Sequence, residues 1–418
     1  MIAEIIAVGS EMLTPHRQDT NSLFLTAELN DLGVQVAFKT IVGDHLSRLI
    51  LSIRIALTRT DVLILSGGLG PTEDDLTREA VASALSLEIQ RDNDLIAALY
   101  KRFAVRKIPM SPNNEKQADV VAGAIILPNK NGSAPGQFLD VVYEGHRKIV
   151  ILLPGPPKEL KPLFENECRR RLASILPPRF IARRFLRIAL VPESIIDAKA
   201  APIYKQYEDV ETTILAHTAE IQLHLLCAKP SLAEAQARVD ELAEKLENAL
   251  GESVFSATGM PLEEVVILLL GMKELTLATA ESCTGGLVAE RLTSVPNSSS
   301  AFSGGSVVYT NELKSIFADV PHELIERHGA VSPETTRALA EGIRRRTGAS
   351  LGLGVTGLAG PGGGAPGPDA ERPIGRVYIA IADGRQTTLT ELNIPGDRER
   401  IRWWASQNAL DQIRRKLL

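Results

Sequence analysis

The chain has 418 residues, which at roughly 100–200 residues per domain indicates two to four domains. Its composition, 44% hydrophobic and 23% charged with a mean hydropathy of +0.02, excludes a disordered chain, because such chains are short of apolar residues. The formal net charge is −5 and the pI is about 5.9, so no basic excess favours nucleic acid or an anionic membrane. We therefore expect a globular multidomain protein with no nucleic-acid partner and no membrane partner.

The cysteines and the N-terminus bear on the cellular compartment. Cys168, Cys227 and Cys283 lie too far apart for a CxxC metal or redox motif, and such an odd, sparse set indicates reduced thiols. Residues 2–8 form a strand-like run with no basic region and long apolar stretch before it, so we expect no signal peptide. The most apolar segment, 265–270, is far shorter than the roughly 20 residues that span a bilayer. These features favour a cytoplasmic protein.

Strand and helix patterns alternate along the first third of the chain, residues 1–168. The expected strands are 2–8, 34–42, 61–65 and 148–153, and the expected helices are 20–32, 45–57, 77–87 and 158–171. A cap at Thr20 or Asn21 would start the first helix. Alternation of this kind implies an α/β domain with a mostly parallel sheet that helices cover on both faces.

Residues 169–257 change in character and predict a small α+β module. The expected elements are a strand over 185–190, a helix over 193–204, a hairpin of 212–215 and 220–228, and an amphipathic helix over 231–250. The arrangement is similar to KH-like modules, but it lacks the GxxG loop that clamps a nucleic-acid backbone in true KH domains. We interpret this stretch as a spacer or dimerisation module, and we expect a homodimer.

A third unit, residues 258–418, is again of the α/β type. The expected helices are 262–272, 312–318, 333–347 and a terminal helix, and the expected strands are 275–280, 306–309, 350–355, 375–382 and 386–392. A Gly/Pro-rich loop over 357–373 interrupts this pattern, and we expect its tail, 365–373, to be an unstructured surface loop.

The first loop that predicts chemistry spans residues 66–77. It follows an apolar strand and opens a helix, a geometry that presents backbone N–H groups to an anion. Gly67, Gly68 and Gly70 would let the backbone approach a phosphate. The acidic run 73–75 opposes a phosphate unless a divalent cation bridges them, and hard oxygen ligands suit magnesium or manganese. Alternatively, these acids merely favour the helix N-terminus.

Two further strand ends should lie at the same carboxyl edge of this sheet, where open α/β sheets bind ligands. Glu11 follows the first strand and Asp44 follows the second. Together with Asp74 and Asp75 they would converge on one metal–phosphate site. The Pro-Gly-Pro-Pro run at 154–157 is either a rigid wall of that pocket or simply a helix start.

The second such loop, 279–286, carries a hydroxyl, a thiol and another hydroxyl from a strand to a helix N-terminus, where backbone donors can stabilise an oxyanion or phosphate. Ser282 and Cys283 compete as nucleophile, and the sequence pairs none of the seven histidines with the thiol. A desolvated lysine is a workable base for a serine, and Tyr309 and Lys314 lie just past the next strand. The alternative is that Ser282 is a plain N-cap.

The third loop, residues 354–364, holds many glycines directly after a strand. This pattern predicts a phosphate-binding nest, with a flexible lid or a surface loop as the alternative.

In this order, the loops resemble the competence/damage-inducible protein A (CinA) family over nearly the whole chain. The motifs that carry the resemblance are SGGLGPTEDDLT at 66–77, NNEKQA at 113–118, NGSAPG at 131–136, LLPGPPKEL at 152–160, ATAESCTGGLVAERL at 278–292, GGSVVYTNELK at 304–314, GAVSPET at 329–335 and GVTGLAGPGGG at 354–364. Each motif alone is modest evidence for the family, whereas eight of them in the same order make a chance resemblance very improbable.

The resemblance implies an N-terminal domain similar to molybdopterin-binding domains, which in this family is associated with metal-dependent hydrolysis of ADP-ribose to AMP and ribose 5-phosphate. It implies a KH-like middle module. The C-terminal unit resembles nicotinamide mononucleotide deamidase, which makes nicotinic acid mononucleotide and ammonia. We expect the first reaction to use magnesium, manganese or cobalt, with potassium as a further candidate, and the deamidase to need no cofactor.

The resemblance, taken with the loops above, assigns the site residues. The catalytic residues are Ser282 as nucleophile, Lys314 as base and Tyr309 as proton relay. The oxyanion and phosphate contacts are Thr284, Gly285, Gly286, Thr356, Gly357 and Gly360. The N-terminal nucleotide contacts are Ser10, Glu11, Asn21, Gly67, Gly68, Gly70, Pro154 and Gly155. The metal ligands are Asp44, Asp74 and Asp75.

One segment departs from the family pattern. Members usually read close to GTELLLGQ near the start, whereas this chain has GSEMLTPH over 9–16, which keeps Glu11 but replaces the later glycine and glutamine by Pro15 and His16. Two rival interpretations of the whole chain stay open. In one, the N-terminal domain is a non-catalytic nucleotide-sensing or partner-binding module linked to competence or recombination. In the other, the chain is a molybdopterin-handling enzyme, although such an enzyme would not need the ESCTGG unit.

Overall fold

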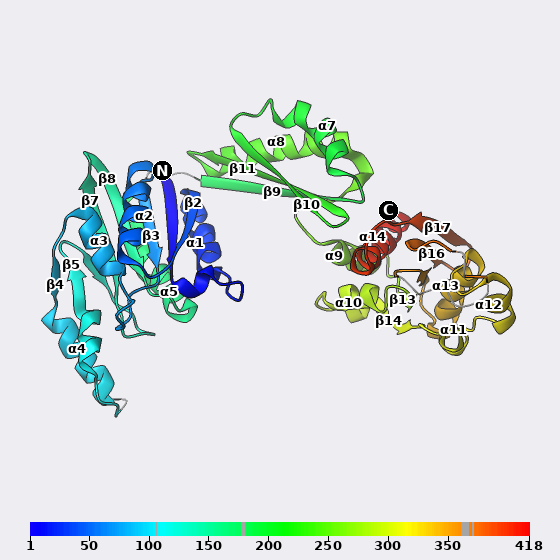
Figure 1. The fold of residues 1–418 in the computed structure, drawn as a ribbon. Coiled ribbons are helices and arrows are strands. Elements are labelled where there is room, and N and C mark those ends of the chain that lie inside the picture. Colours follow the sequence, from blue (N-terminus) through cyan, green and yellow to red (C-terminus); the bar gives the residue numbers. More distant parts are fainter. Residues whose placement is uncertain (106, 177–179, 361–367, 370–371) are drawn as a thin grey trace. The chain divides into compact units, whose positions relative to one another are not determined.

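The computed structural model describes residues 1–105, 107–176, 180–360, 368–369 and 372–418 (Figure 1). The chain divides into two compact units, Met1–Ala182 with Ala228–Gln236, and Arg183–Cys227 with Ala237–Leu418. The first unit holds the expected N-terminal α/β domain, and the second holds the C-terminal sheet. The three-part division with boundaries after residues 168 and 257 stays a prediction.

The N-terminal domain is built on a six-stranded sheet in the order β2-β1-β3-β8-β7-β6. The strands are β1 Ile2–Val8, β2 Gln35–Val42, β3 Val62–Ser66, β6 Ile125–Leu127, β7 Gly136–Tyr143 and β8 His146–Leu153. Strands β2, β1, β3 and β8 are parallel, which confirms the mostly parallel sheet. Strands β7 and β6 extend it in the antiparallel sense, and this extension was not expected from the sequence. A separate antiparallel pair joins β4 Ile89–Arg91 to β5 Asp119–Val121.

Helices cover both faces of this sheet, as the sequence predicts. They are α1 Thr20–Asp31, α2 Leu46–Arg59, α3 Thr77–Leu85, α5 Pro157–Leu163 and α6 Arg169–Ile175, whereas α4 Asn93–Val105 packs against the 3₁₀ helix Pro112–Ala118. Successive strand residues point to opposite faces. Accordingly, Leu65 packs in a cluster with Ile53 of α2, whereas Ile64 packs in another with Leu25 of α1 and Leu160 of α5.

Two local details of this domain differ from the expectations. Asp19 caps α1, in place of Thr20 or Asn21, and its carboxylate accepts a hydrogen bond from the Ser22 amide at 2.9 Å. A carboxylate at this position also interacts favourably with the helix dipole. The helix expected over 158–171 is interrupted by a π-helical turn at Phe164–Cys168 and continues to Ile175. Pro162, which cannot donate a backbone hydrogen bond, lies just before that turn.

The middle α+β stretch forms a four-stranded sheet in the order β10-β11-β9-β12. Its elements are β9 Phe180–Ala189, α7 Glu193–Tyr204, β10 Val210–His217, β11 Glu220–Lys229, α8 Leu232–Leu250 and β12 Val254–Ser256. The expected hairpin is confirmed, because β10 and β11 pair in the antiparallel sense along their whole length.

The C-terminal domain has a five-stranded sheet in the order β14-β13-β15-β16-β17. Its strands are β13 Leu277–Glu281, β14 Phe302–Val307, β15 Leu351–Gly357, β16 Arg376–Ala382 and β17 Thr387–Asn393. Its helices are α9 Leu262–Met272, α10 Leu287–Thr293, α11 Asn311–Ala318, α12 His322–His328, α13 Pro333–Thr347 and α14 Arg398–Leu417. Strands β14, β13 and β15 are parallel, whereas β16 and β17 are antiparallel to their neighbours. Helix α12 was not expected.

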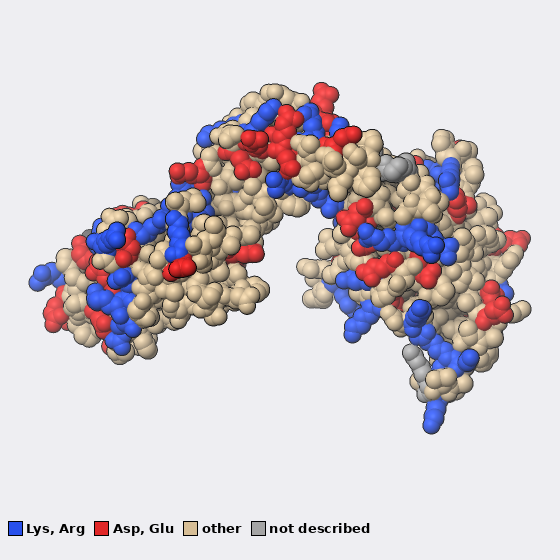
Figure 2. All heavy atoms as spheres, turned by 180° about the vertical axis from the view of Figure 1, so that it is seen from behind, with Lys and Arg blue, Asp and Glu red and all other residues tan. Residues whose placement is uncertain are grey.

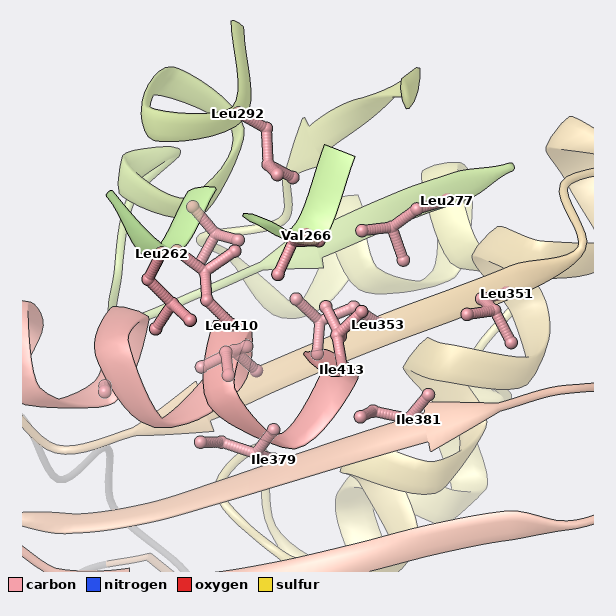
Figure 3. Packing of buried hydrophobic residues seen from close by; sticks show 14 of the residues in the cluster. Leu262, Val266, Leu277, Leu292, Leu351, Leu353, Ile379, Ile381, Leu410 and Ile413 are labelled. Atoms are coloured by element: carbon pink, nitrogen blue, oxygen red, sulfur yellow. The ribbon is translucent and has the colours of Figure 1, made fainter. Parts of the chain in front are cut away.

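Figure 3 shows the hydrophobic core on one face of the C-terminal sheet. Leu353 of β15 and Ile379 of β16 share one buried cluster with Val266 of α9 and Ile413 of α14. Burying an aliphatic side chain of this size contributes about 1.5–3 kcal/mol to stability. This cluster therefore holds α9 and α14 on the same face of the sheet.

Glycines bring the opposite face of β15 against α13. A Cβ at Gly352 would lie 2.1 Å from the carbonyl oxygen of Ala340, and one at Gly354 would lie 2.6 Å from that of Thr336. Both distances are too short for a methyl group beside a carbonyl. Gly354, one of the glycines from which we predicted a phosphate-binding nest, therefore serves helix–sheet packing.

Charged side chains of both signs are interspersed on the face shown in Figure 2. Two basic clusters, 344–346 and 414–416, lie in the last turns of α13 and α14, where cations complement the helix dipole. Within the described ranges, no helix has the length and apolar character needed to cross a membrane.

Replacing Gly342 of α13 by alanine should lower the free energy of unfolding. Its Cβ would lie 1.6 Å from the carbonyl oxygen of Ala318 at the end of α11, so the two helices must separate. Overpacking of this kind costs about 1–3 kcal/mol. Urea unfolding of the variant measures the effect.

Gly271→Ala in α9 is the matched control. Apart from its own helix backbone and chain neighbours, no atom of the described residues lies within 4 Å of a Cβ built there. Alanine is favoured over glycine in a helix by about 1 kcal/mol, so this variant should be as stable as the parent or more so. Equal stability of the two alanine variants would contradict the close contact at Gly342.

Candidate functional sites

The C-terminal site lies at the carboxyl ends of the parallel strands β13, β14 and β15. Ser282 directly follows β13, and its amide donates to the carbonyl of Val355 in β15 at 2.9 Å. The amide of Val308, just beyond β14, donates to the carbonyl of Glu281 at 2.8 Å. These bonds hold the three strand ends together at the edge where α/β sheets bind ligands.

Lys314 places a buried amine at this edge. The residue is 2% exposed, and its Nζ donates to the carbonyl of Val308 at 3.0 Å. Burial lowers the pKa of Lys314 to about 8, because desolvation penalises the ammonium ion, while Asp369 and Cys283 act in the opposite direction. A lysine with this pKa is partly neutral near physiological pH and can accept a proton.

The two candidate nucleophiles have different surroundings. Cys283 belongs to the hydrophobic cluster of the α9 and α14 face, and its sulfur would lie 2.9 Å from a Cβ at Gly357. Burial raises the pKa of Cys283 to about 12, so the reactive thiolate is scarce at neutral pH. Ser282 does not depend on prior ionisation, because a neighbouring base can take its proton during attack. The environment therefore favours Ser282.

Glu281, a residue that we did not predict, occupies the N-terminus of α10. Its buried carboxylate accepts hydrogen bonds from the amides of Val288 at 3.0 Å and Ala289 at 2.8 Å. The N-cap residue of α10 is Gly286, so the alternative that Ser282 is a plain N-cap is wrong. The available signal was a carboxylate at the end of a strand, seven and eight residues before the two helical amides that it contacts.

The oxyanion candidates 284–286 form a tight turn after Ser282. The amide of Gly285 donates to the Ser282 carbonyl at 3.1 Å, so this donor is already used. Within the described part of the chain, the Gly286 amide makes no backbone hydrogen bond and the buried Thr284 hydroxyl has no partner. Gly286, which is partly exposed, is therefore the member of this set that has a donor left for a ligand, whereas the unpaired Thr284 hydroxyl is enclosed by the protein.

The third loop, residues 354–364, offers fewer phosphate contacts than we expected. Thr356 is fully buried, and its hydroxyl shares a 2.7 Å hydrogen bond with that of Thr336 in α13, so its side chain is turned away from a phosphate. A Cβ at Gly357 would lie 2.8 Å from Val377, which indicates close strand packing. Gly360 faces Arg398, whose guanidinium would lie 3.6 Å from a Cβ there. Residues 361–364 lie outside the described residues.

Of the tail 365–373, which we expected to be an unstructured surface loop, residues 365–367 and 370–371 lie outside the described residues, and the described part is held by specific contacts. Asp369 is 6% exposed and accepts hydrogen bonds from the amides of Ala330 at 2.7 Å and Val331 at 3.3 Å. Arg372 donates to the carbonyl of His328 at 2.8 Å. The described part of the tail is therefore anchored on the 329–335 motif, because its carboxylate satisfies backbone donors that would otherwise be buried without partners.

Two arginines of α14 complete the site and were missed from the sequence. Arg398 donates to the Tyr309 hydroxyl at 2.9 Å, and Arg402 donates twice to the Thr284 carbonyl, at 3.2 and 2.8 Å. Among the described residues, no hydrogen bond joins Tyr309 to Lys314. Cations near a helix N-terminus oppose the helix dipole, so Arg398 in the first turn of α14 and Arg402 one turn further on were a usable signal for anion binding.

The N-terminal site is a cavity of about 290 Å³ at the carboxyl edge of the six-stranded sheet. It brings together most of the predicted N-terminal residues: Glu11, Asp44, Gly67, Gly68, Gly70, Asp74, Asp75, Pro154 and Gly155. The other two support its walls. Ser10 exchanges hydrogen bonds with Asp44 at 2.7 and 3.0 Å, and Asn21 donates to the Gly155 carbonyl at 2.7 Å.

The glycine turn of this cavity is dictated by close backbone contacts. Gly67 has a φ of +107°, and a Cβ there would lie 2.3 Å from the carbonyl oxygen of Val8 in β1. A Cβ at Gly68 would lie 2.2 Å from the Thr77 hydroxyl at the start of α3. No other residue type fits these two positions without displacing a strand or a helix.

The predicted metal ligands do not form a preformed cage. Asp44 accepts from the Ser10 amide, and Asp75 accepts from the Thr72 amide at 2.8 Å and from its hydroxyl. The described residues contain no group of three or more His, Cys, Asp or Glu side chains that could hold a metal ion. A cation held here would therefore take one or two of these carboxylates and would need phosphate oxygens and water to complete its shell, the coordination that Mg²⁺ adopts in many proteins.

These features define a chain of two α/β domains, one with a glycine-lined pocket and one with a serine loop at the same strand edge as a buried lysine. The family model described as "Probable molybdopterin binding domain" matches residues 4–174, and that described as "CinA C-terminal domain" matches residues 260–417. The chain belongs to the CinA family.

Relatives of the same length support this assignment. A CinA-like protein of Acidobacterium capsulatum is 57% identical over 418 residues, and one of Koribacter versatilis is 54% identical, each match covering 100% of both chains. Among solved structures, the competence/damage inducible protein CihA of Agrobacterium tumefaciens is 36% identical, covers 36% of this chain and 90% of its own, and has a TM-score of 0.34.

The pKa of Lys314 should lie near 8, and Asp369→Asn should lower it further. The negative charge of Asp369 favours the protonated amine, so its removal shifts the equilibrium toward the neutral form. ¹³C NMR titration of the lysine Cε signals measures both values, with Lys314→Arg identifying the signal that disappears. An unchanged or raised pKa in Asp369→Asn would contradict this coupling.

Proposed function

We propose that the C-terminal domain deamidates nicotinamide mononucleotide, giving nicotinic acid mononucleotide and ammonia. The observation that supports this most directly is the buried Lys314 amine, with a pKa lowered to about 8, at the strand edge that also carries Ser282. Amide hydrolysis by a serine needs a base of this kind, since the hydroxyl is a weak nucleophile at its own pKa.

In the first step the Ser282 oxygen attacks the carboxamide carbon, and Lys314 takes the hydroxyl proton. The carbonyl oxygen becomes an oxyanion that the Gly286 amide would stabilise, and one such donor contributes roughly 3 kcal/mol in other enzymes. Lys314 then returns the proton to the amide nitrogen, and the C–N bond breaks to release ammonia. This leaves an ester between Ser282 and the nicotinoyl group.

In the second step a water molecule attacks the ester carbon, with Lys314 again taking the proton. Collapse of this intermediate breaks the ester bond, returns the proton to Ser282 and releases the carboxylate product. The 5′-phosphate of the substrate would lie by Arg398 and Arg402, the cations at the start of α14. In this arrangement Tyr309 orients Arg398, a role that replaces the proton relay predicted from the sequence.

Ser282→Ala should reduce ammonia release from nicotinamide mononucleotide by at least about a thousandfold, because no other group forms the ester. A coupled ammonia assay measures the rate, and circular dichroism checks the fold. Cys283→Ala is the matched control and should retain most activity, since that thiol belongs to the core. Loss of activity only in Cys283→Ala would transfer the nucleophilic role to the thiol.

For the N-terminal domain we propose metal-dependent hydrolysis of ADP-ribose to AMP and ribose 5-phosphate. The supporting observation is the single cavity that combines the glycine turn 67–70 with Asp44, Asp74 and Asp75. A bound divalent cation would supply charge neutralisation of the diphosphate and an activated water. The chain itself supplies the glycine turn that admits the phosphates and the carboxylates that hold the cation.

The double substitution Asp74→Asn with Asp75→Asn, made in the full chain, should abolish Mg²⁺- or Mn²⁺-dependent AMP release from ADP-ribose. Removing two negative charges weakens cation binding, whereas ammonia release by the C-terminal domain should be unchanged. Chromatographic detection of AMP measures the first activity. Retained hydrolysis would contradict the assignment, and an inactive parent chain would favour the rival interpretation of a nucleotide-sensing or partner-binding module.

A further inference from the structure

A cavity of about 340 Å³ lies at the edge of the C-terminal sheet opposite to the serine loop. It is lined by the last two turns of α13, the end of β16, the turn 383–386 and the start of β17. Ala382, the last residue of β16, pairs with Gly352 near the start of β15, whereas Ser282 contacts the carboxyl end of β15. The cavity therefore belongs to neither candidate site, and we name it the arginine cavity.

Three arginines give this cavity its charge. Arg344 and Arg345 come from α13, and Arg385 comes from the turn between β16 and β17. Among the described residues that line the cavity, Glu341 is the one acid, so three guanidinium groups and one carboxylate leave a net charge of +2. A concave lining with this excess of positive charge attracts anions.

Two of these arginines lack a partner among the described residues. The side chains of Arg345 and Arg385 are exposed and take part in no ion pair or hydrogen bond there. Glu341 lies one helical turn before Arg345, a spacing that allows an ion pair, but its carboxylate accepts a hydrogen bond from the Thr387 hydroxyl at 2.7 Å. The positive charge of the cavity is therefore not compensated by the acid beside it.

Arg344, the third arginine, is held in place from two sides. Its Nε donates to the carbonyl of Ser350 at 3.0 Å, and a Cβ at Gly384 would lie 2.4 Å from its Nη2. Gly384 has a φ of +87°, so glycine is favoured at the point where the turn passes over the guanidinium. The two terminal nitrogens of Arg344 are accessible and donate no hydrogen bond within the described part of the chain. They are ordered donors that a ligand can use.

The helix dipole explains only part of this arrangement. Arg344 and Arg345 lie in the last turn of α13, where cations are favoured. Arg385 lies in a turn between antiparallel strands, and a sheet has little net dipole. Like charges that are brought together repel each other, so the three arginines are costly without an anion between them. Guanidinium groups bind phosphate through pairs of parallel N–H donors.

We propose that the arginine cavity binds a small polyanion that carries phosphate groups, either free diphosphate or the diphosphate of a nucleotide. The net charge of the lining calls for at least two negative charges on the ligand. The volume lies at the lower end of the range of small-molecule sites, roughly 300–1,000 Å³. Arg344 would orient one phosphate, and the exposed Arg345 and Arg385 would neutralise the remaining charge. This site is independent of both proposed functions.

Protection from phenylglyoxal, a reagent that modifies accessible guanidinium groups, tests this assignment at each arginine. The full chain is treated with and without inorganic pyrophosphate at constant ionic strength, and peptide mass spectrometry measures the modification rates. We expect pyrophosphate to slow the modification of Arg345 and Arg385 at least about tenfold. Arg346, the control, pairs with Asp319 and does not line the cavity, so its rate should change less than about twofold.

Variants at exposed positions supply the second measurement. In the double variant Arg345→Gln with Arg385→Gln, protection of Arg344 should need at least about tenfold more pyrophosphate, whereas the matched variant Arg346→Gln should behave as the parent. ADP in place of pyrophosphate should protect as well if the ligand is a nucleotide, and should not if it is free diphosphate.

Three results would overturn the proposal. Equal modification rates with and without pyrophosphate would show that the cavity holds no such anion. Equal protection of Arg346 would reveal a general effect of the anion on the surface. Protection by citrate without protection by pyrophosphate would exclude a phosphate compound as the ligand. Because the rates are resolved by residue, phosphate bound at either candidate site does not affect these conclusions.

Discussion

The close approach of β15 to α13 is the constraint on which the C-terminal domain depends. Gly352 and Gly354 admit the helix backbone to a distance that no side chain allows, and Gly342 does the same for the end of α11. Because α11 carries Lys314, this packing also determines how deeply the amine is buried. Desolvation of the Lys314 amine lowers its pKa. The contacts that pack the helices against the sheet therefore also affect the proton affinity of Lys314.

The two α/β domains use the carboxyl ends of parallel strands differently. In the N-terminal domain the proposed diphosphate would contact the backbone of turn 67–70, and the aspartates that line the same cavity would hold a cation. In the C-terminal domain positive charge comes from Arg398 and Arg402 at the start of a helix that is distant in sequence. Under the two proposed functions, a chain with a net charge of −5 would thus receive anionic nucleotides at two places without a basic surface.

The sequence predicts those parts of the fold and sites that depend on local patterns. Ser282 and Lys314 lie in short motifs next to strands, and the structure brings both to one sheet edge. Arg402 and Asp369 were missed because their partners lie 118 and 39 residues away, at Thr284 and Ala330 respectively, and no local spacing records such contacts. The antiparallel extension of the N-terminal sheet was missed because we looked for alternating strands and helices, whereas the eight-residue β7 reaches β8 through the two-residue turn 144–145 with no helix between them, and β6 has only three residues.

Glu281 separates two tasks that helix N-termini often combine. Its buried carboxylate already compensates the positive end of the α10 dipole. The loop 282–286 therefore attracts a substrate phosphate only weakly. Attraction of the anionic group is left to α14, an element outside the loop that carries the nucleophile. Under the proposed function, ligand choice and bond cleavage would therefore depend on different elements: substitutions at the start of α14 would change which anion is accepted while the serine loop is preserved.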